Sequence, residues 1–178
     1  MPFQPLFTGK LVRLAAPAPE DREIMARWTQ DDLYMRLLDD DPVRPRDLSE
    51  PEEHGDNYTL HVRTLDNDTL IGFVALYRLR WASGTAEIAI GIGDPAYRGR
   101  GYGSDALQLL LNYAFNELNL YRVGLSVMSY NAAAIRAYER AGFVREGAQR
   151  GAVLREGQRF DMVLYGILRD EWLRAQSG

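Results

Sequence analysis

The feature that most constrains this chain is a glycine-rich stretch near its middle, Tyr97–Gly103, with the sequence YRGRGYG. A strand-like run, Ala86–Ile92, leads into it, and an amphipathic helical pattern over Tyr102–Leu118 follows it. Three glycines at alternate positions allow positive φ and let successive N–H groups face one side. A helix that begins there adds unpaired N–H groups and the positive end of its dipole. The stretch therefore predicts a seat for a phosphate or pyrophosphate at residues 98–103.

Two common phosphate-binding motifs do not fit the rest of the chain. A Walker A loop needs Gly-Lys-Ser/Thr, but the only lysine, Lys10, is followed by Leu11. The segment Gly91–Ala96, GIGDPA, matches the dinucleotide pattern G-x-G-x-x-A. No helix opens there and no βαβ unit surrounds it, which argues against a Rossmann site. A coenzyme A pyrophosphate loop is the third candidate.

The order of the expected elements predicts an α+β fold with mixed strand directions rather than a doubly wound parallel sheet. Helical patterns are expected from Pro19, carrying Ile24, Met25 and Trp28, and over Asp32–Leu38, Tyr102–Leu118 and Ala132–Ala141. The polar interval Asp39–Asn57 is expected to be a long loop. Strands are expected over Lys10–Ala15, Tyr58–Leu65, Leu70–Trp81, Thr85–Ile92, Tyr121–Met128, Phe143–Val153 and Arg159–Leu168.

Composition limits the classes of function. The 178 residues predict a single domain over 1–178. The chain has no cysteine, which excludes disulfides, thiolate metal sites and a cysteine nucleophile, and its two histidines are too few for a histidine-rich metal site. A net charge of −4 argues against a general nucleic-acid coat. No leader-like or membrane-spanning segment is evident, so we expect a cytoplasmic protein.

Two motifs resemble one superfamily. The pattern Arg98-x-x-Gly101-x-Gly103 resembles the acyl-CoA loop, Q/R-x-x-G-x-G/A, of the GNAT N-acetyltransferases. The segment Ser129–Phe143 is similar to that superfamily's second cofactor segment, N-x-x-A-x-x-x-Y-x-x-x-G-F. The tail, which includes Glu146, Gly147, Arg150, Gly157, Asp161, Tyr165, Leu168, Glu171 and Trp172, resembles the RimJ/RimL-like branch. The resemblance spans nearly the whole chain.

The resemblance implies a GNAT-like fold: a mixed, mostly antiparallel central sheet of about seven strands flanked by about four helices, in three αβα layers. It also implies acetyl-CoA as co-substrate and no metal. The N–H groups of residues 98–103 would bind the pyrophosphate, and the strand Glu87–Ile92 would offer backbone groups to the pantetheine arm. The implied cofactor-binding residues are Ile90, Gly91, Ile92, Arg98, Gly99, Arg100, Gly101, Tyr102, Gly103, Asn131, Arg136 and Tyr138.

Each of these residues also has a plain structural reading. The glycines of the loop could make only a tight turn, and Arg98 and Arg100 could be solvated surface arginines. Gly91 and Gly93 suit a close ligand approach, or they mark a weak strand. Asn131 can cap a helix, alone or together with a role at the cofactor.

Two residues are expected to act in catalysis. Tyr138 is a candidate acid, because a phenol with a pKa of about 10 can protonate a leaving thiolate with a pKa of about 8.5. A core aromatic is its alternative reading. Glu87, a carboxylate in an otherwise apolar strand, is the candidate base, acting through water, with an ion pair to an arginine as its alternative.

We therefore expect an acetyl-CoA-dependent N-acetyltransferase that transfers the acetyl group directly to a primary amine in a ternary complex. The RimJ/RimL resemblance favours a protein or peptide N-terminal α-amine. A small-molecule amine (polyamine, antibiotic or amino acid) and a non-catalytic acyl-CoA-binding module stay open. The expected partners are acetyl-CoA and the acceptor, with no nucleic acid and no membrane, and a homodimer is left open.

Several residues are candidates for the acceptor side. Trp28, Tyr34, Tyr77 and Trp81 could wall the acceptor pocket or pack in the core. Asp161 is expected near the acceptor by resemblance, or else it makes a hydrogen bond at a strand end. The acids of Asp39–Asp56 could steer a cationic acceptor, with solvated loop residues as the alternative.

Overall fold

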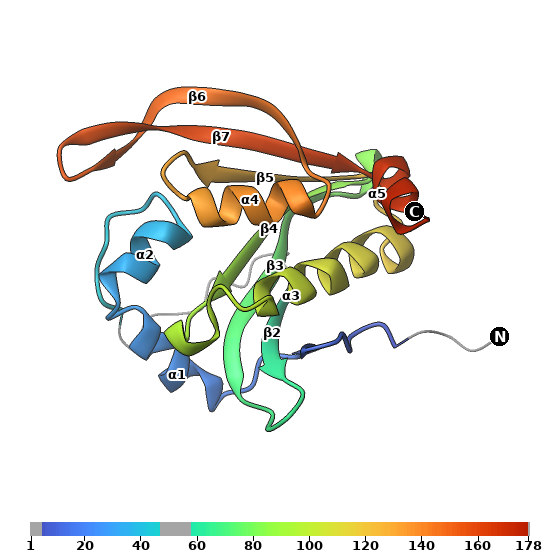
Figure 1. The fold of residues 1–178 in the computed structure, drawn as a ribbon, viewed down its shortest axis with the longest axis horizontal. Coiled ribbons are helices and arrows are strands. Elements are labelled where there is room, and N and C mark those ends of the chain that lie inside the picture. The colour runs from blue at the N-terminus through green and yellow to red at the C-terminus, as the bar shows by residue number, and fades with distance from the viewer. Residues whose placement is uncertain (1–4, 47–57, 178) are drawn as a thin grey trace.

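A seven-stranded sheet forms the centre of the protein, in the order β1-β2-β3-β4-β5-β7-β6 (Figure 1). The computed structural model describes residues 5–46 and 58–177. The strands are β1 (Val12–Ala15), β2 (Tyr58–Thr64), β3 (Leu70–Arg80), β4 (Thr85–Ile92), β5 (Arg122–Met128), β6 (Val144–Arg155) and β7 (Gln158–Leu168). The helices are α1 (Asp21–Trp28), α2 (Asp32–Leu38), α3 (Tyr102–Asn112), α4 (Ala132–Arg140) and α5 (Arg169–Gln176). The expected mixed α+β fold is confirmed.

The sheet is antiparallel except at one place. β4 and β5 are parallel and pair over only three residue pairs, from Thr85 with Arg122 to Glu87 with Gly124. Beyond Glu87 each strand continues, β4 to Ile92 and β5 to Met128, without pairing to the other. The two strands therefore diverge and leave an opening in the middle of the sheet.

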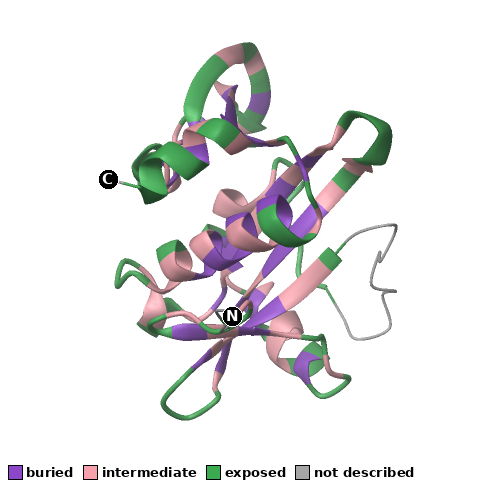
Figure 2. Ribbon diagram, turned by 90° about the vertical axis from the view of Figure 1, so that its right-hand side faces the viewer, coloured by how far each residue is buried: buried purple, intermediate pink, exposed green. Residues whose placement is uncertain are grey.

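Helix α3 covers one face of this sheet. Its leucines Leu107, Leu110 and Leu111 are buried and share one core with Val74 of β3 and Ile88 of β4. The 3.6-residue spacing of the leucines puts them on one side of the helix. The helical pattern expected to Leu118 continues past α3 in a π-helical turn, Tyr113–Glu117. Figure 2 shows buried residues along the strands and on the helices that lie against them.

Helices α1 and α2 pack in a second core, which contains Trp28, Tyr34, Met35 and Leu70. A Cβ on Gly93 would lie 1.9 Å from Cδ2 of Trp28. A Cβ on Gly91 would lie 2.7 Å from the Tyr34 hydroxyl. Gly93 therefore has to be glycine because α1 lies directly on the backbone, whereas a side chain on Gly91 would have to displace the ends of neighbouring side chains, the Tyr34 hydroxyl among them. This is a different reason from the close approach of a ligand that the sequence suggested.

Helix α5 has no counterpart among the expected elements. It begins after Leu168, whose N–H donates to the Glu171 carboxylate at 2.9 Å. Trp172 is 5% exposed and its ring lies 5.4 Å from that of Phe115. The sheet therefore has a further helix beyond the four that the sequence predicted.

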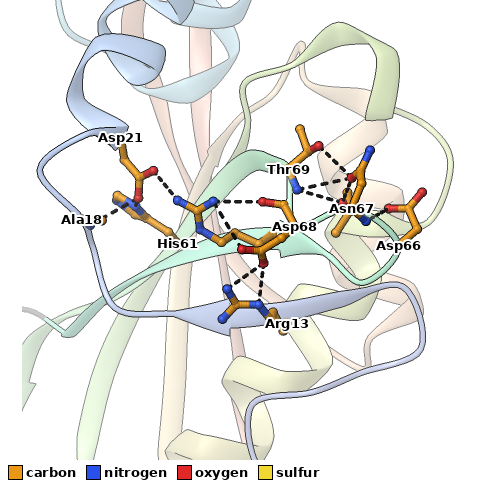
Figure 3. A network of polar contacts seen from close by, with 10 residues as sticks. Arg13, Ala18, Asp21, His61, Asp66, Asn67, Asp68 and Thr69 are labelled. Atoms are coloured by element: carbon orange, nitrogen blue, oxygen red, sulfur yellow. Dashed lines mark hydrogen bonds and ion pairs between the residues drawn. The ribbon is translucent and has the colours of Figure 1, made fainter.

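A buried polar network joins α1 to β2 (Figure 3). The Asp21 carboxylate accepts hydrogen bonds from Nδ1 of His61 at 2.6 Å, from the N–H of Ala18 at 3.2 Å, and from Arg63. Asp21 and His61 are 1% and 2% exposed. Burial by itself would raise the pKa of Asp21, but the hydrogen bonds from His61 and Arg63 outweigh it and lower the pKa.

Neither a membrane span nor a metal centre is found in the described part of the chain. No helix there is long and apolar enough to cross a bilayer. No group of three or more histidine, aspartate or glutamate side chains in residues 5–46 and 58–177 could hold a metal ion.

Candidate functional site

The glycine-rich loop ends at the first turn of α3. Gly99 and Gly101 have φ values of 69° and 90°, in the region that glycine adopts without strain. The first backbone bond of the helix runs from the N–H of Asp105 to the carbonyl of Gly101, at 3.0 Å. The N–H groups of residues 102–104 therefore have no partner within the helix, and the helix dipole is positive there. This backbone can hold a pyrophosphate.

Gly103 differs from the other two glycines of the loop, because it lies within α3 and has no positive φ. A Cβ on it would lie 3.4 Å from Cγ1 of Ile92. This is an ordinary van der Waals contact, so neither space nor backbone angle requires glycine at 103, while Gly99 and Gly101 make the turn. Thus two of the three glycines use the backbone freedom that the sequence suggested.

Arg98 is engaged within the protein rather than solvated. Its guanidinium donates to the carbonyls of Ile92 at 2.9 Å and Gly93 at 2.6 Å. It also forms an ion pair with Asp31 at 3.1 Å and lies 5.2 Å from the centre of the Tyr34 ring. Asp31 in turn caps α2 by accepting from the N–H of Tyr34. Arg98 thus joins the loop to the end of β4 and to α2.

Arg100 is exposed, as the alternative interpretation of this residue held. It donates to the carbonyl of Ala96 at 3.0 Å, and its guanidinium lies 5.8 Å from the centre of the Tyr102 ring.

A cavity of about 630 Å³ fills the opening between β4 and β5 and reaches the glycine-rich loop. We call it the upper cavity. From β4 and the loop it is lined by Ile88, Ala89, Ile90, Gly91, Ile92, Tyr97, Arg98, Gly99, Gly101, Gly103 and Ser104. From β5 and α4 it is lined by Ser126, Val127, Met128, Asn131, Ala133, Ala134, Arg136, Ala137, Tyr138 and Arg140. Of the expected cofactor-binding residues, only Arg100 and Tyr102 are outside this lining.

Asn131 and Tyr138 come from α4. The amide oxygen of Asn131 accepts from the N–H of Ala134 at 3.2 Å, so it caps the helix as expected. Its amide nitrogen donates to the carbonyl of Leu37 at 3.1 Å, which ties α4 to the end of α2. Tyr138 is 8% exposed. Its pKa is raised to about 12, mainly by burial and to a smaller extent by the nearby Tyr77. Tyr138 therefore holds its proton at every ordinary pH.

Glu87 lies at the point where β4 and β5 separate, and two side chains contact it. Nη1 of Arg78 lies 3.2 Å from both carboxylate oxygens. Tyr77, its direct partner on β3, also hydrogen-bonds the carboxylate. Burial and then the charge of Glu87 raise the pKa of Tyr77 to about 12.

A bulge in β3 makes this double contact possible. The register of β3 and β4 shifts between Tyr77 and Arg80, and Arg78 has a φ of 50°. In a regular strand neighbouring side chains point to opposite faces. Here the Arg78 guanidinium lies 5.8 Å from the centre of the Tyr77 ring, so both side chains turn to the same carboxylate. A positive φ at a residue with a long side chain is strained, and such strain is often found at functional sites.

A second cavity, of about 660 Å³, lies on the Glu87 side of the opening. We call it the lower cavity. Asp40, Ser126 and Met162 line both cavities, so the two adjoin. The other residues of its lining are Arg78, Arg80, Ser83, Thr85, Ala86, Glu87, Arg122, Gly124, Leu125, Glu146, Gln149, Leu164 and Tyr165.

The structure brings together only part of the expected acceptor side. Tyr34 and Tyr77 line the upper cavity, and Asp39 lines it beside Asp40. Burial raises the pKa of Asp39. Trp28 packs against α2 instead, with its ring 6.4 Å from that of Tyr34. Most acids of the expected loop, Asp47, Glu50, Glu52, Glu53 and Asp56, lie outside the described residues.

Two further candidates lie away from the cavities. Trp81 is 57% exposed, and its ring lies 6.3 Å from that of Tyr58. Asp161 accepts from the N–H of Gly151 at 2.9 Å and lines neither cavity. Asp161 therefore makes a structural hydrogen bond, but inside the β6–β7 hairpin, where the register shifts between Gln149 and Val153, and not at a strand end as the alternative held.

Ser126 and Met162, which lie where the two cavities meet, were not among the predicted site residues. Ser126 left a signal: it is an exposed polar residue in β5, whose neighbours Leu125 and Val127 are buried. Met162 left none, because an apolar residue in the closing hairpin suggests core packing.

Comparisons with known proteins identify relatives over most of the chain. Residues 12–144 match the family described as "Acetyltransferase (GNAT) domain". The "Probable N-acetyltransferase YjcK" of Bacillus subtilis is 32% identical over 156 residues, which cover 85% of this chain and 84% of that protein. The "Spermidine N(1)-acetyltransferase" of Vibrio cholerae is 33% identical over 104 residues, which cover 58% of this chain and 60% of that protein.

The fold also has close counterparts among solved structures. The crystal structure of spermidine N-acetyltransferase from Vibrio cholerae in complex with CoA and spermine has a TM-score of 0.82. It is 24% identical in sequence, and the match covers 91% of this chain and 98% of that one. At this identity the likeness shows a shared fold.

Proposed function

The chain belongs to the GNAT acetyltransferase family, and we propose that it transfers an acetyl group from acetyl-CoA to the α-amine at the N-terminus of a peptide or protein. The observation that carries the proposal is the pair of adjoining cavities: the upper one reaches the anion-binding start of α3, and the lower one contains the carboxylate of Glu87, where β4 and β5 separate. The single sheet that contains all seven strands supports a single domain over residues 1–178.

Acetyl-CoA would lie along the upper cavity. The free N–H groups of residues 102–104 and the turn at Gly99 and Gly101 would hold the pyrophosphate. The edge of β4 beyond Glu87 has no partner on the β5 side, so its backbone groups are available to the amides of the pantetheine arm. Arg136 is exposed and lines the cavity, where it would contact phosphate oxygens.

The chemistry is a direct transfer. The amine nitrogen attacks the thioester carbonyl, the C–N bond forms, the C–S bond breaks, and the amine loses a proton. We assign Tyr138 as the acid that protonates the leaving sulfur, because its high pKa keeps it a donor. We assign Glu87, through water, as the group that receives the proton of the amine.

The RimJ/RimL-like motifs in the tail of the sequence support an α-amine acceptor. The demand on a base also differs between acceptors: an α-amine with a pKa near 8 is about one tenth neutral at pH 7, whereas an amine with a pKa near 10.4 is almost fully charged. A polyamine is the second candidate, because the structure from Vibrio cholerae that shares this fold is a spermidine N-acetyltransferase.

Two measurements test the proposal. Calorimetry with acetyl-CoA should show one site per chain, and absence of binding would contradict the function as a whole. A thiol-release assay with peptides, spermidine, aminoglycosides and amino acids should then show the highest kcat/KM for a peptide with a free N-terminus. A higher value for spermidine would replace the α-amine with a polyamine as the acceptor.

Glu87→Gln tests the base. The variant should lose at least about tenfold in kcat/KM at pH 7 and less at pH 9, where more of the amine is already neutral. Glu23→Gln is the matched control, since Glu23 is also paired with an arginine, Arg27, but lines neither cavity. Equal losses in the two variants would show that Glu87 is only a structural charge.

A further inference from the structure

Six charged side chains line the lower cavity: Arg78, Arg80 and Arg122 are cationic, and Asp40, Glu87 and Glu146 are anionic. Four of them form two ion pairs. Arg78 pairs with Glu87, and Arg122 forms a two-pronged contact with Glu146. Within each pair the two charges neutralise each other. The charge that the cavity offers to a ligand therefore comes from the remaining two residues.

Arg80 and Asp40 are those two. Both are exposed, and neither side chain has a hydrogen-bond or ion-pair partner in residues 5–46 and 58–177. Asp40 lies at the junction with the upper cavity, which it also lines, and Arg80 lines only the lower cavity. The lower cavity therefore has an anion where it meets the cofactor channel and a cation elsewhere in its lining.

The position of Asp40 is fixed by its backbone. The guanidinium of Arg155 donates to the carbonyls of Asp39 at 2.7 Å and Asp40 at 3.3 Å. Arg36, at the end of α2, pairs with Glu156 in the turn next to Arg155. The end of α2 is thus attached to the β6–β7 hairpin at the edge of both cavities.

We propose that the lower cavity is the acceptor site and that it selects an amine that also carries a carboxylate. Asp40 attracts the amino group to the junction with the cofactor channel, and Arg80 binds the carboxylate. The inference rests on the proposed function and narrows its acceptor class. A guanidinium binds a carboxylate through two parallel hydrogen bonds, which makes Arg80 suited to this role.

The charges of this cavity disfavour a polyamine. Spermidine has several ammonium groups and no anion, so it would bring a cation next to Arg80, and like charges repel. The lower cavity has a volume of about 660 Å³, which is larger than a free amino acid needs. This size favours, as the acceptor, the first residues of a peptide that has an acidic side chain. A free amino acid offers the same pair of groups, and the assay separates the two sources.

The test compares kcat/KM for matched acceptors with saturating acetyl-CoA. One tripeptide has Glu at its second position and an amidated C-terminus, and its partner has Gln there. Free glutamate, glutamine amide and spermidine complete the set. The wild-type protein should prefer the Glu peptide by about tenfold, the size expected for one charge-assisted contact. A preference for free glutamate over glutamine amide of similar size, with no preference between the peptides, would assign the carboxylate to an amino acid.

Arg80→Gln should abolish the preference. Arg150→Gln is the control, because Arg150 is an exposed arginine on β6 that lines neither cavity, and it should keep the preference. Equal use of acidic and neutral acceptors by the wild-type protein would overturn the inference, as would a preference that survives Arg80→Gln or spermidine as the best acceptor. Failure of the proposed function gives a different result, since no acceptor would then release thiol.

Discussion

The two tyrosines at the centre of the opening have a shared electrostatic environment. Tyr77 and Tyr138 come from β3 and α4, and both line the upper cavity. Burial raises the pKa of each to about 12, and each is also affected by a nearby group: Tyr77 by Glu87, and Tyr138 by Tyr77. A phenol that stays protonated can donate a hydrogen bond but cannot act as a base. Tyr138 is therefore restricted to the role of acid.

Tyr138→Phe should lower kcat by about 100-fold and leave KM for acetyl-CoA within about twofold, because the ring remains and only the proton donor is lost. Wild-type kcat should show no fall due to Tyr138 up to about pH 11, since its pKa is about 12. Steady-state kinetics across this pH range checks both points. An unchanged kcat in the variant would remove Tyr138 from the mechanism.

At the scale of elements, α1 lies directly on the backbone at the end of β4. The Trp28 ring occupies the space where a side chain on Gly93 would be. The N–H of Gly93 also bonds the carbonyl of Ile71 at 2.9 Å, so the backbone cannot move away freely. A methyl group at this position must displace either the ring or the strand.

Gly93→Ala should therefore lower the free energy of unfolding by about 1–3 kcal/mol, the usual range for overpacking a core. Gly147→Ala is the matched control, because a Cβ there meets no atom within 4 Å. It should change the free energy by less than about 0.5 kcal/mol. Denaturant unfolding measures both, and equal effects would show that the packing of α1 does not require Gly93.

At the scale of the whole molecule, the network around Asp21 links stability to pH. The folded-state pKa of Asp21 is lowered from 3.8, so its contribution is present above that value and is lost as the pH falls through the folded pKa. Asp21→Asn should lower the free energy of unfolding by about 3 kcal/mol at pH 7, because it leaves Arg63 without its buried partner. The difference from the wild type should shrink below about pH 3.8.

Asp170→Asn is the control for this prediction. Asp170 is an exposed acid in the first turn of α5, so its loss should have an effect below about 0.5 kcal/mol. Unfolding by urea at pH 7 and pH 3 separates the two variants. A constant difference between Asp21→Asn and the wild type across this range would show that the Asp21 charge is not the source of the stability.

Much of the fold could be predicted from local patterns. The bounds of α2 agree with the expectation, and those of the strands differ by only a few residues, because apolar spacing and turn residues are local signals. α5 was not predicted, since its stability comes from Trp172 on Phe115, 57 positions earlier in the chain. The bulge at Arg78 was not visible either, because Leu70–Trp81 reads as an uninterrupted strand.

The candidate site shows the same difference between local signals, which the sequence reveals, and contacts between distant residues, which it does not. The glycine turn and the Asn131 cap are local, and the sequence contained enough to predict both. The contacts of Arg98 with Asp31 and of Arg155 with Asp39 join residues far apart in the chain, so no spacing could indicate them. The divergence of β4 and β5, which makes the cavity, depends on where their pairing stops and not on either strand alone.

Arg98 has a consequence for how two ligands affect each other. Its guanidinium connects the loop that would hold the coenzyme to the cap of α2, and the far end of α2 is followed by Asp40, which lines both cavities. A shift of the loop on occupation changes the support of that helix, and a shift of the helix changes the loop. The affinities for the two substrates are then linked by one coupling free energy, which thermodynamics requires to be equal in both directions. Binding of either substrate then changes the affinity for the other by the same factor.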